Sequence, residues 1–155
     1  MKLSQPLKPL HLPVRVALGV LFLRVVVGLA FMFHGYGKIQ NPLGWMGPDA
    51  AVPGILQAAA AVSEFCGGLA WILGLLTPLA SLGLGCTMSV AVYMHAAVRQ
   101  DPFVARGEGG SYELALVYLC VAVLLLLAGP GRFSADRLVF GKRIPSVPRA
   151  EVSEA

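Results

Sequence analysis

Charged residues are scarce in this 155-residue chain: Lys, Arg, Asp and Glu make up only 13% of it, whereas 57% is hydrophobic. A soluble domain averages about a quarter charged residues. A chain with so little charge has too few polar groups to cover a water-exposed surface, which argues against a soluble globular fold. Continuous apolar runs are what a bilayer requires.

Motifs for common catalytic chemistry are also missing. The sequence has no phosphate-binding loop, no zinc-ligand spacing and no serine-based triad. Cys66, Cys86 and Cys120 stand alone in separate apolar runs without a CxxC pair, so we interpret them as small buried hydrophobic residues and expect no metal site. No cleavable signal is predicted, because Arg24 interrupts the first apolar run and no small-x-small cleavage site follows.

The net charge of +4 would suggest a nucleic-acid partner in a soluble protein. Here the basic residues flank the apolar runs, which favours orientation in a membrane and contact with anionic lipid. We therefore expect the lipid bilayer as a partner and no nucleic acid.

Four apolar runs, each long enough for a transmembrane helix, account for most of the chain. They cover residues 14–37, 54–76, 79–98 and 112–128. Thr77-Pro78 separates the second run from the third, because proline lacks a backbone donor and disfavours helix in the residue before it. Lipid offers no partner to a free amide, so each run must be helical. The sequence predicts an all-α membrane protein, a four-transmembrane-helix bundle with a tight Thr-Pro hairpin between its second and third helices.

The segments around this bundle are short. We expect a polar N-terminal arm over residues 1–13, the transmembrane domain with a juxtamembrane segment over 14–140, and a flexible tail over 141–155. Ser134 is placed to cap a short helix that runs through Phe140.

The distribution of the twelve basic residues predicts the orientation of the chain. With the N-terminus inside, eight lie on the inner side and three in the outer loops. The inner set is Lys2, Lys8, Arg15, Arg132, Arg137, Lys142, Arg143 and Arg149, and the outer set is Lys38, Arg99 and Arg106. The positive-inside rule then predicts that both termini are cytoplasmic.

Two charged residues interrupt the apolar runs. Arg24 and Glu64 each lie about ten residues into a run, which corresponds to about 15 Å of helix. The two helices enter from opposite faces, so both residues are expected near the midplane. An unpaired charge there costs about 2.5 kcal/mol or more. We predict an intramembrane Arg24–Glu64 ion pair, and whether it fixes helix register or contacts a ligand is left open.

A second group of polar residues is expected at the outer ends of the helices. His34 and Lys38 close the first run, His95 lies near the end of the third, and Glu113 opens the fourth. Histidine titrates near neutral pH and can pass protons or hydrogen-bond a carbonyl. These four residues form a candidate ligand or proton site, with Glu113 as a partner for histidine. Interfacial anchoring is the alternative interpretation.

Three stretches resemble a known family. The stretch from Arg24 to Lys38, RVVVGLAFMFHGYGK, resembles the first helix of the DoxX family. EFCGGLAWILGLLTPLAS, which begins at Glu64, resembles the family's second helix and Thr-Pro turn. GPGRFSADRL, which begins at Gly129, is similar to its closing Gly-Pro-Gly-x-x-Ser-x-Asp signature. The resemblance as a whole covers about residues 15–140.

The resemblance implies a four-helix protein of the bacterial inner membrane, in which Arg24, His34, Lys38 and Glu64 occupy signature positions. Some members of the family are membrane subunits of thiosulfate:quinone oxidoreductases, and others are linked to oxidative-stress complexes. We therefore expect a membrane subunit of a redox complex, linked to a quinone or a sulfur compound, with quinone as the implied cofactor.

Two other functions stay open. The chain could be a non-catalytic membrane anchor that recruits a protein partner or a second copy of itself. It could also be a small-solute carrier, since an internal ion pair is typical of transport routes, although no inverted repeat is detectable.

Overall fold

The computed structural model describes residues 12–140; the predicted tail and all but residues 12 and 13 of the predicted arm lie outside that range. The described residues form helices joined by turns and loops. These are α1 (Val14–Gln40), α2 (Gly54–Leu73), α3 (Thr77–Tyr93), which continues into the π-helical turn η1 (Met94–Val98), α4 (Glu113–Ala128) and α5 (Ala135–Phe140).

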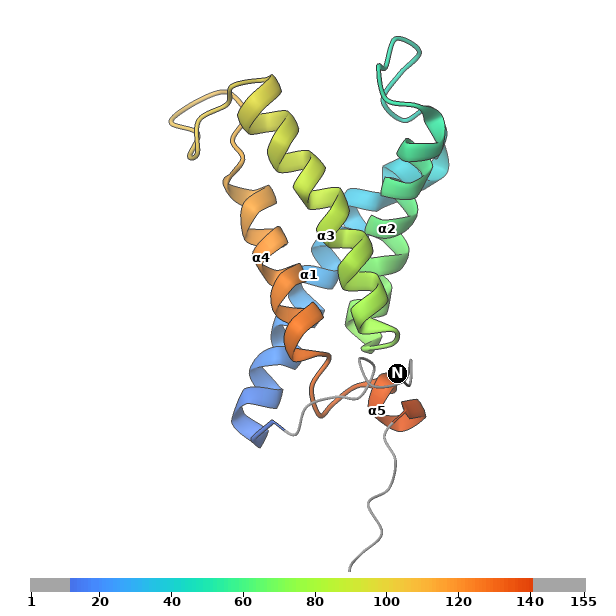
Figure 1. Cartoon of the computed structure of the whole chain (residues 1–155), viewed down its shortest axis with the longest axis vertical. Helices are drawn as coiled ribbons and strands as arrows, with labels where there is room; N and C mark the ends of the chain where they lie inside the picture. Colours follow the sequence, from blue (N-terminus) through green and yellow to red (C-terminus); the bar gives the residue numbers. More distant parts are fainter. Residues whose placement is uncertain (1–11, 141–155) are drawn as a thin grey trace, which may run out of the picture.

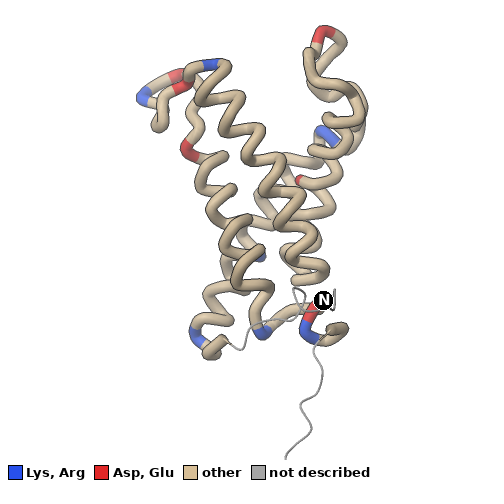
Figure 2. Tube along the Cα trace, viewed as in Figure 1, with Lys and Arg blue, Asp and Glu red and all other residues tan. Residues whose placement is uncertain are grey.

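Three of these helices are long and apolar enough to cross a membrane: α1, α2 and the continuous helix formed by α3 and η1. The fourth, α4, is apolar but has 16 residues. At 1.5 Å per residue it extends about 24 Å, somewhat less than a hydrocarbon core of about 30 Å. Charged residues gather at the two ends of the molecule, and the middle of the helices is nearly free of them (Figure 2). The prediction of an all-α membrane protein is confirmed.

The helices pack as two pairs. α1 lies along α2, α3 lies along α4, and α2 and α3 join the pairs. The pairs approach each other at the end that carries α5 and diverge toward the loops 41–53 and 99–112 (Figure 1). Apolar side chains from all four helices meet between the pairs. These include Val27, Phe31, Trp71, Leu84, Met88, Val121, Ala122 and Leu125.

Three helix ends differ by two or more residues from the sequence prediction. α1 continues to Gln40 rather than ending at residue 37. α2 ends at Leu73 rather than at residue 76, because Gly74 adopts the left-handed conformation (φ 66°) that terminates a helix. The α2–α3 turn is therefore tight, and Thr77-Pro78 begins α3.

Glycines allow α1 and α2 to pack closely. A Cβ atom on Gly28 would lie 2.7 Å from the carbonyl oxygen of Gly68, and one on Gly35 would lie 2.6 Å from the backbone nitrogen of Phe65. Both contacts are to backbone, which cannot rotate away. Small residues at such crossings are how membrane helices associate.

Gly28→Ala is therefore expected to lower the free energy of unfolding by about 1–3 kcal/mol, because the added methyl group pushes two backbones apart. Gly19→Ala is a matched control in the same helix, since a Cβ there meets nothing within 4 Å. Alanine is the better helix former, so this control should be neutral or slightly stabilising. SDS-induced unfolding in mixed micelles measures both, and equal values for the two variants would contradict close packing at Gly28.

The three cysteines are exposed on the surface of the bundle, so the expectation that they are buried was wrong. Each helix of this four-helix bundle buries only one stripe of its surface, and small apolar thiols on the remaining surface are compatible with lipid.

Candidate functional site: two polar centres

Arg24 is 1% exposed and binds backbone carbonyls from two distant segments. Its Nε donates to Trp71 O at 2.7 Å and its Nη2 to Ile72 O at 3.0 Å. Its Nη1 donates to Pro130 O at 2.7 Å and to Phe133 O at 2.8 Å. Trp71 O and Ile72 O belong to the last turn of α2, where backbone carbonyls have few hydrogen-bond partners within the helix. The planar guanidinium group thus ties α1 to the end of α2 and to the segment after α4.

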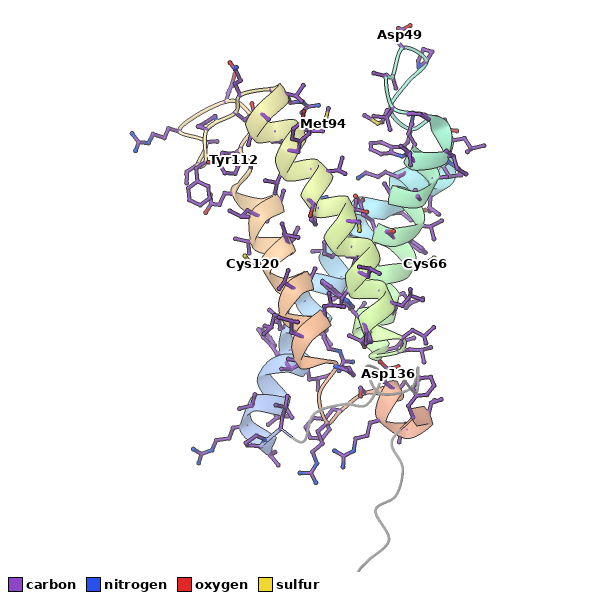
Figure 3. The ribbon with its side chains drawn as sticks, viewed as in Figure 1. Asp49, Cys66, Met94, Tyr112, Cys120 and Asp136 are labelled. Carbon is purple, nitrogen blue, oxygen red and sulfur yellow. The ribbon has the colours of Figure 1, made fainter. Side chains whose placement is uncertain are left out.

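Arg24 and Asp136 form the first polar centre, and Asp136 contacts the α2–α3 turn. Its carboxylate accepts hydrogen bonds from Leu76 N at 2.6 Å and Thr77 N at 2.9 Å, and its own N–H donates to Gly74 O at 2.8 Å. It lies directly beneath the α2–α3 turn (Figure 3). The negative charge is thus at the N-terminus of α3 and the positive charge of Arg24 is at the C-terminus of α2, as the two helix dipoles favour.

The predicted Arg24–Glu64 ion pair was wrong. A count of residues from the ends of the apolar runs places both charges near the midplane. However, α1 is longer than its neighbours and begins well before the level at which α2 ends, so Arg24 lies beside Trp71 and Ile72 rather than beside Glu64.

Glu64 instead pairs with Lys38 and forms the second centre. Lys38 Nζ lies 2.6 Å and 2.7 Å from the two carboxylate oxygens. The Glu64 side chain is 3% exposed and that of Lys38 is 26% exposed. The ammonium group also lies 4.5 Å from the centre of the Trp45 ring, within the range of a cation–π contact. Lys38 neutralises a carboxylate that water can barely reach.

Gln57 holds the loop 41–53 over this ion pair. It is 4% exposed, its Nε2 donates to Val52 O at 2.8 Å, and its Oε1 accepts from Met46 N at 3.0 Å. Trp45 Nε1 donates to the carbonyl of the same residue at 2.9 Å. These bonds keep the indole ring beside Lys38.

His34 lies one turn before Lys38, but on an exposed part of α1. Its ring is 6.1 Å from that of Tyr118 in an edge-on arrangement. Tyr118 in turn lies 4.8 Å from Phe31. The α1 residues at positions 31, 34 and 38 therefore line one face of the helix, with an aromatic cluster at one end and the ion pair at the other.

His95 and Glu113 do not join this face. His95 Nδ1 lies 2.7 Å from an Asp101 carboxylate oxygen, so the expected pairing of histidine with Glu113 was wrong. The π-helical turn that ends α3 brings Asp101 back to His95, and Asp101 N donates to His95 O at 2.9 Å. Glu113 is exposed at the start of α4. Over residues 12–140, no group of three or more His, Cys, Asp or Glu side chains could hold a metal ion.

The family model for DoxX matches residues 12–97, more than half of the chain. The chain belongs to the DoxX family. It is 33% identical to an uncharacterized protein of Haemophilus influenzae over 123 residues, which cover 78% of this chain and 90% of that protein. It is 32% identical to the inner membrane protein YqjF of Escherichia coli over 127 residues, which cover 78% of this chain and 92% of the relative. No solved structure matches the chain significantly.

The closing segment that resembles the DoxX signature has a structural role here. Gly129 (φ 73°) and Gly131 (φ 79°) adopt backbone conformations that favour glycine, and they turn the chain so that Pro130 O faces Arg24. Ser134 Oγ accepts from Arg137 N at 3.3 Å, as predicted for the cap of the short helix α5. Asp136 then caps α3. The motif is visible in the sequence, but its contacts with Arg24 and with the α2–α3 turn are not.

Proposed function

We propose that this DoxX-family protein spans the bacterial inner membrane with four helices and keeps both termini in the cytoplasm. The name of the relative YqjF supports the inner membrane. The three long apolar helices and α4 support four crossings, with the bilayer thinning slightly at α4. The positive-inside rule supports cytoplasmic termini, because eight of the twelve basic residues of the sequence lie on the side of the termini and three lie on the side of the loops 41–53 and 99–112.

We further propose that the protein is the membrane subunit of a redox complex, linked to a quinone or a sulfur compound, and that it holds a quinone on the α1 face that carries His34 and Lys38, beside Tyr118 of α4. The observation that carries this proposal is the buried Lys38–Glu64 pair one turn from an exposed histidine. An ionisable pair inside a membrane protein is a functional-site hypothesis by default.

The side chains present fit a quinone head group. The half-buried Tyr118 supplies an aromatic surface for its ring, with the buried Phe31 packed behind it, and the ring N–H of His34 and the hydroxyl group of Tyr118 can donate to its carbonyl oxygens. A bound quinone would supply two-electron redox chemistry. Glu64 and Lys38 would keep a proton-exchanging pair next to it, and the loop held by Gln57 would limit the access of water.

The test is the quinone content of the protein in native nanodiscs, measured by solvent extraction and chromatography. We expect the wild type to retain quinone and His34→Ala to lose at least about 90% of it, because one good hydrogen bond corresponds to about 1.5 kcal/mol or tenfold in affinity. His95→Ala is the matched control, since His95 bonds to Asp101 at the far end of α3, and it should retain quinone. The proposal would be contradicted if the wild-type protein contains no quinone and if added quinone analogues do not change its thermal stability.

A non-catalytic anchor for a protein partner or a second copy is the competing function. It is favoured because Lys38 already binds both carboxylate oxygens of Glu64, so the ion pair needs no ligand to satisfy it. An anchor needs no charge at this position. If Lys38→Met/Glu64→Leu folds and assembles its native complex with unchanged activity, the anchor is supported and the quinone site is excluded.

A further inference from the structure

Over residues 12–140, the end of the molecule that carries α5 presents basic side chains without exposed acidic ones. Arg15 and Arg132 are exposed and Arg137 is half-buried, and the basic positions form a row along this end (Figure 2). The acidic residue described there, Asp136, is 0% exposed because it caps α3. The surface at this end is therefore cationic.

Large apolar side chains project from the same segment. Leu138 is 87% exposed, Val139 is 65% exposed and Phe133 is 42% exposed. Phe133 follows Arg132 directly, and Leu138 and Val139 follow Arg137. A soluble tail would not expose three large apolar residues in seven positions, whereas apolar residues beside arginines are typical of a segment that lies in a membrane interface.

The position of this segment is fixed by the centre around Arg24. Pro130 O and Phe133 O are bound by the guanidinium group, and Asp136 is bound to the α2–α3 turn through both its backbone and its carboxylate. α5 is therefore held beneath the ends of α2 and α3 (Figure 1). Those ends mark the limit of the apolar core, where phospholipid head groups begin.

We propose that residues 132–140 form a lipid-binding surface that takes anionic phospholipid head groups. Arg132 and Arg137 bind the phosphates, while Phe133, Leu138 and Val139 enter the boundary of the acyl chains. The observations favour a lipid over a protein partner because the apolar residues continue the apolar surface of the bundle at a fixed depth and the flanking charges are all basic. The proposal is independent of quinone binding.

The test uses the full-length chain in nanodiscs of phosphatidylcholine alone or with phosphatidylglycerol. A spin label is placed at Leu138→Cys in a background in which Cys66, Cys86 and Cys120 are replaced by alanine. Its accessibility to oxygen, which partitions into lipid, is compared with that to an aqueous nickel chelate. A label at Asp49→Cys, at the tip of the opposite loop (Figure 3), is the water-exposed control.

With phosphatidylglycerol, we expect the Leu138 label to be accessible to oxygen and about fivefold less accessible to the nickel chelate than the Asp49 label. Arg132→Gln/Arg137→Gln should remove most of the effect of phosphatidylglycerol, and an unchanged melting temperature in detergent would show that the double variant still folds. A Leu138 label as accessible to the chelate as the Asp49 label would overturn the proposal. Equal protection in both lipid mixtures would also overturn it.

Discussion

Replacing Arg24 with leucine is expected to lower the free energy of unfolding by at least about 3 kcal/mol, since loss of a buried charged group leaves its partners unsatisfied. Four carbonyl oxygens lose their donor at once, and those of Pro130 and Phe133 belong to the segment that holds α5. The buried carboxylate of Asp136 also loses a nearby positive charge. The measurement is SDS-induced unfolding in mixed micelles.

Arg15→Leu is the control for this variant. Arg15 lies in the same helix and is exposed, so the same change there should alter the free energy of unfolding by less than about 0.5 kcal/mol. Arg24→Lys should recover only part of the loss, because an ammonium group cannot reproduce the planar array of donors that binds two segments together. Full stability of Arg24→Lys would show that charge alone is needed and that the carbonyl contacts are not.

Lys38→Met is expected to destabilise the protein by about 3–5 kcal/mol, the cost of leaving one member of a buried ion pair alone. Glu64 is 3% exposed, so its carboxylate has little contact with water once Lys38 is removed. SDS-induced unfolding in mixed micelles is the measurement.

Replacing the other member of the ion pair, Glu64, should destabilise the protein less. Glu64→Leu leaves Lys38 with 26% of its side chain exposed and with a flexible chain that can turn its ammonium group toward water. We expect a loss of about 1–2 kcal/mol, in line with partly exposed charges. The double variant Lys38→Met/Glu64→Leu should be nearly as stable as the wild type, because hydrophobic pairs often replace buried ion pairs without loss. A double variant as unstable as Lys38→Met would contradict this explanation.

The fold was predictable from the sequence because a bilayer restricts it so strongly. Lipid permits only helices in a chain of this kind, so the four apolar runs and the break at Thr77-Pro78 place each element within a few residues. Ser134 could be identified as a cap because capping depends only on residues close in sequence.

The partners of the buried charges could not be predicted, because they depend on how far each helix is displaced along its neighbour. Depth counted from the end of an apolar run placed Arg24 level with Glu64. In the structure, Gly28 packs on Gly68 and Gly35 on Phe65, and this register brings Lys38 to Glu64. The glycines were visible in the sequence, but which glycine faces which was not.

The role of Asp136 was missed for a related reason. It acts 60 residues away on Leu76 N, and only the turn at Gly129 and Gly131 brings it there. An acidic residue shortly after a Gly-Pro-Gly turn, combined with a helix start that has no capping side chain of its own at Leu76, is the signal that could have indicated the contact.

A pair of double-mutant cycles tests the assignment of the two centres most directly. One cycle combines Lys38→Met with Glu64→Leu, the other combines Arg24→Leu with the same Glu64→Leu, and unfolding in mixed micelles gives the coupling energies. The losses expected above imply about 4 kcal/mol or more of coupling between Lys38 and Glu64. We expect less than about 0.5 kcal/mol between Arg24 and Glu64, as for residues without shared partners. Strong coupling of Glu64 to Arg24, with little to Lys38, would contradict the structure described above.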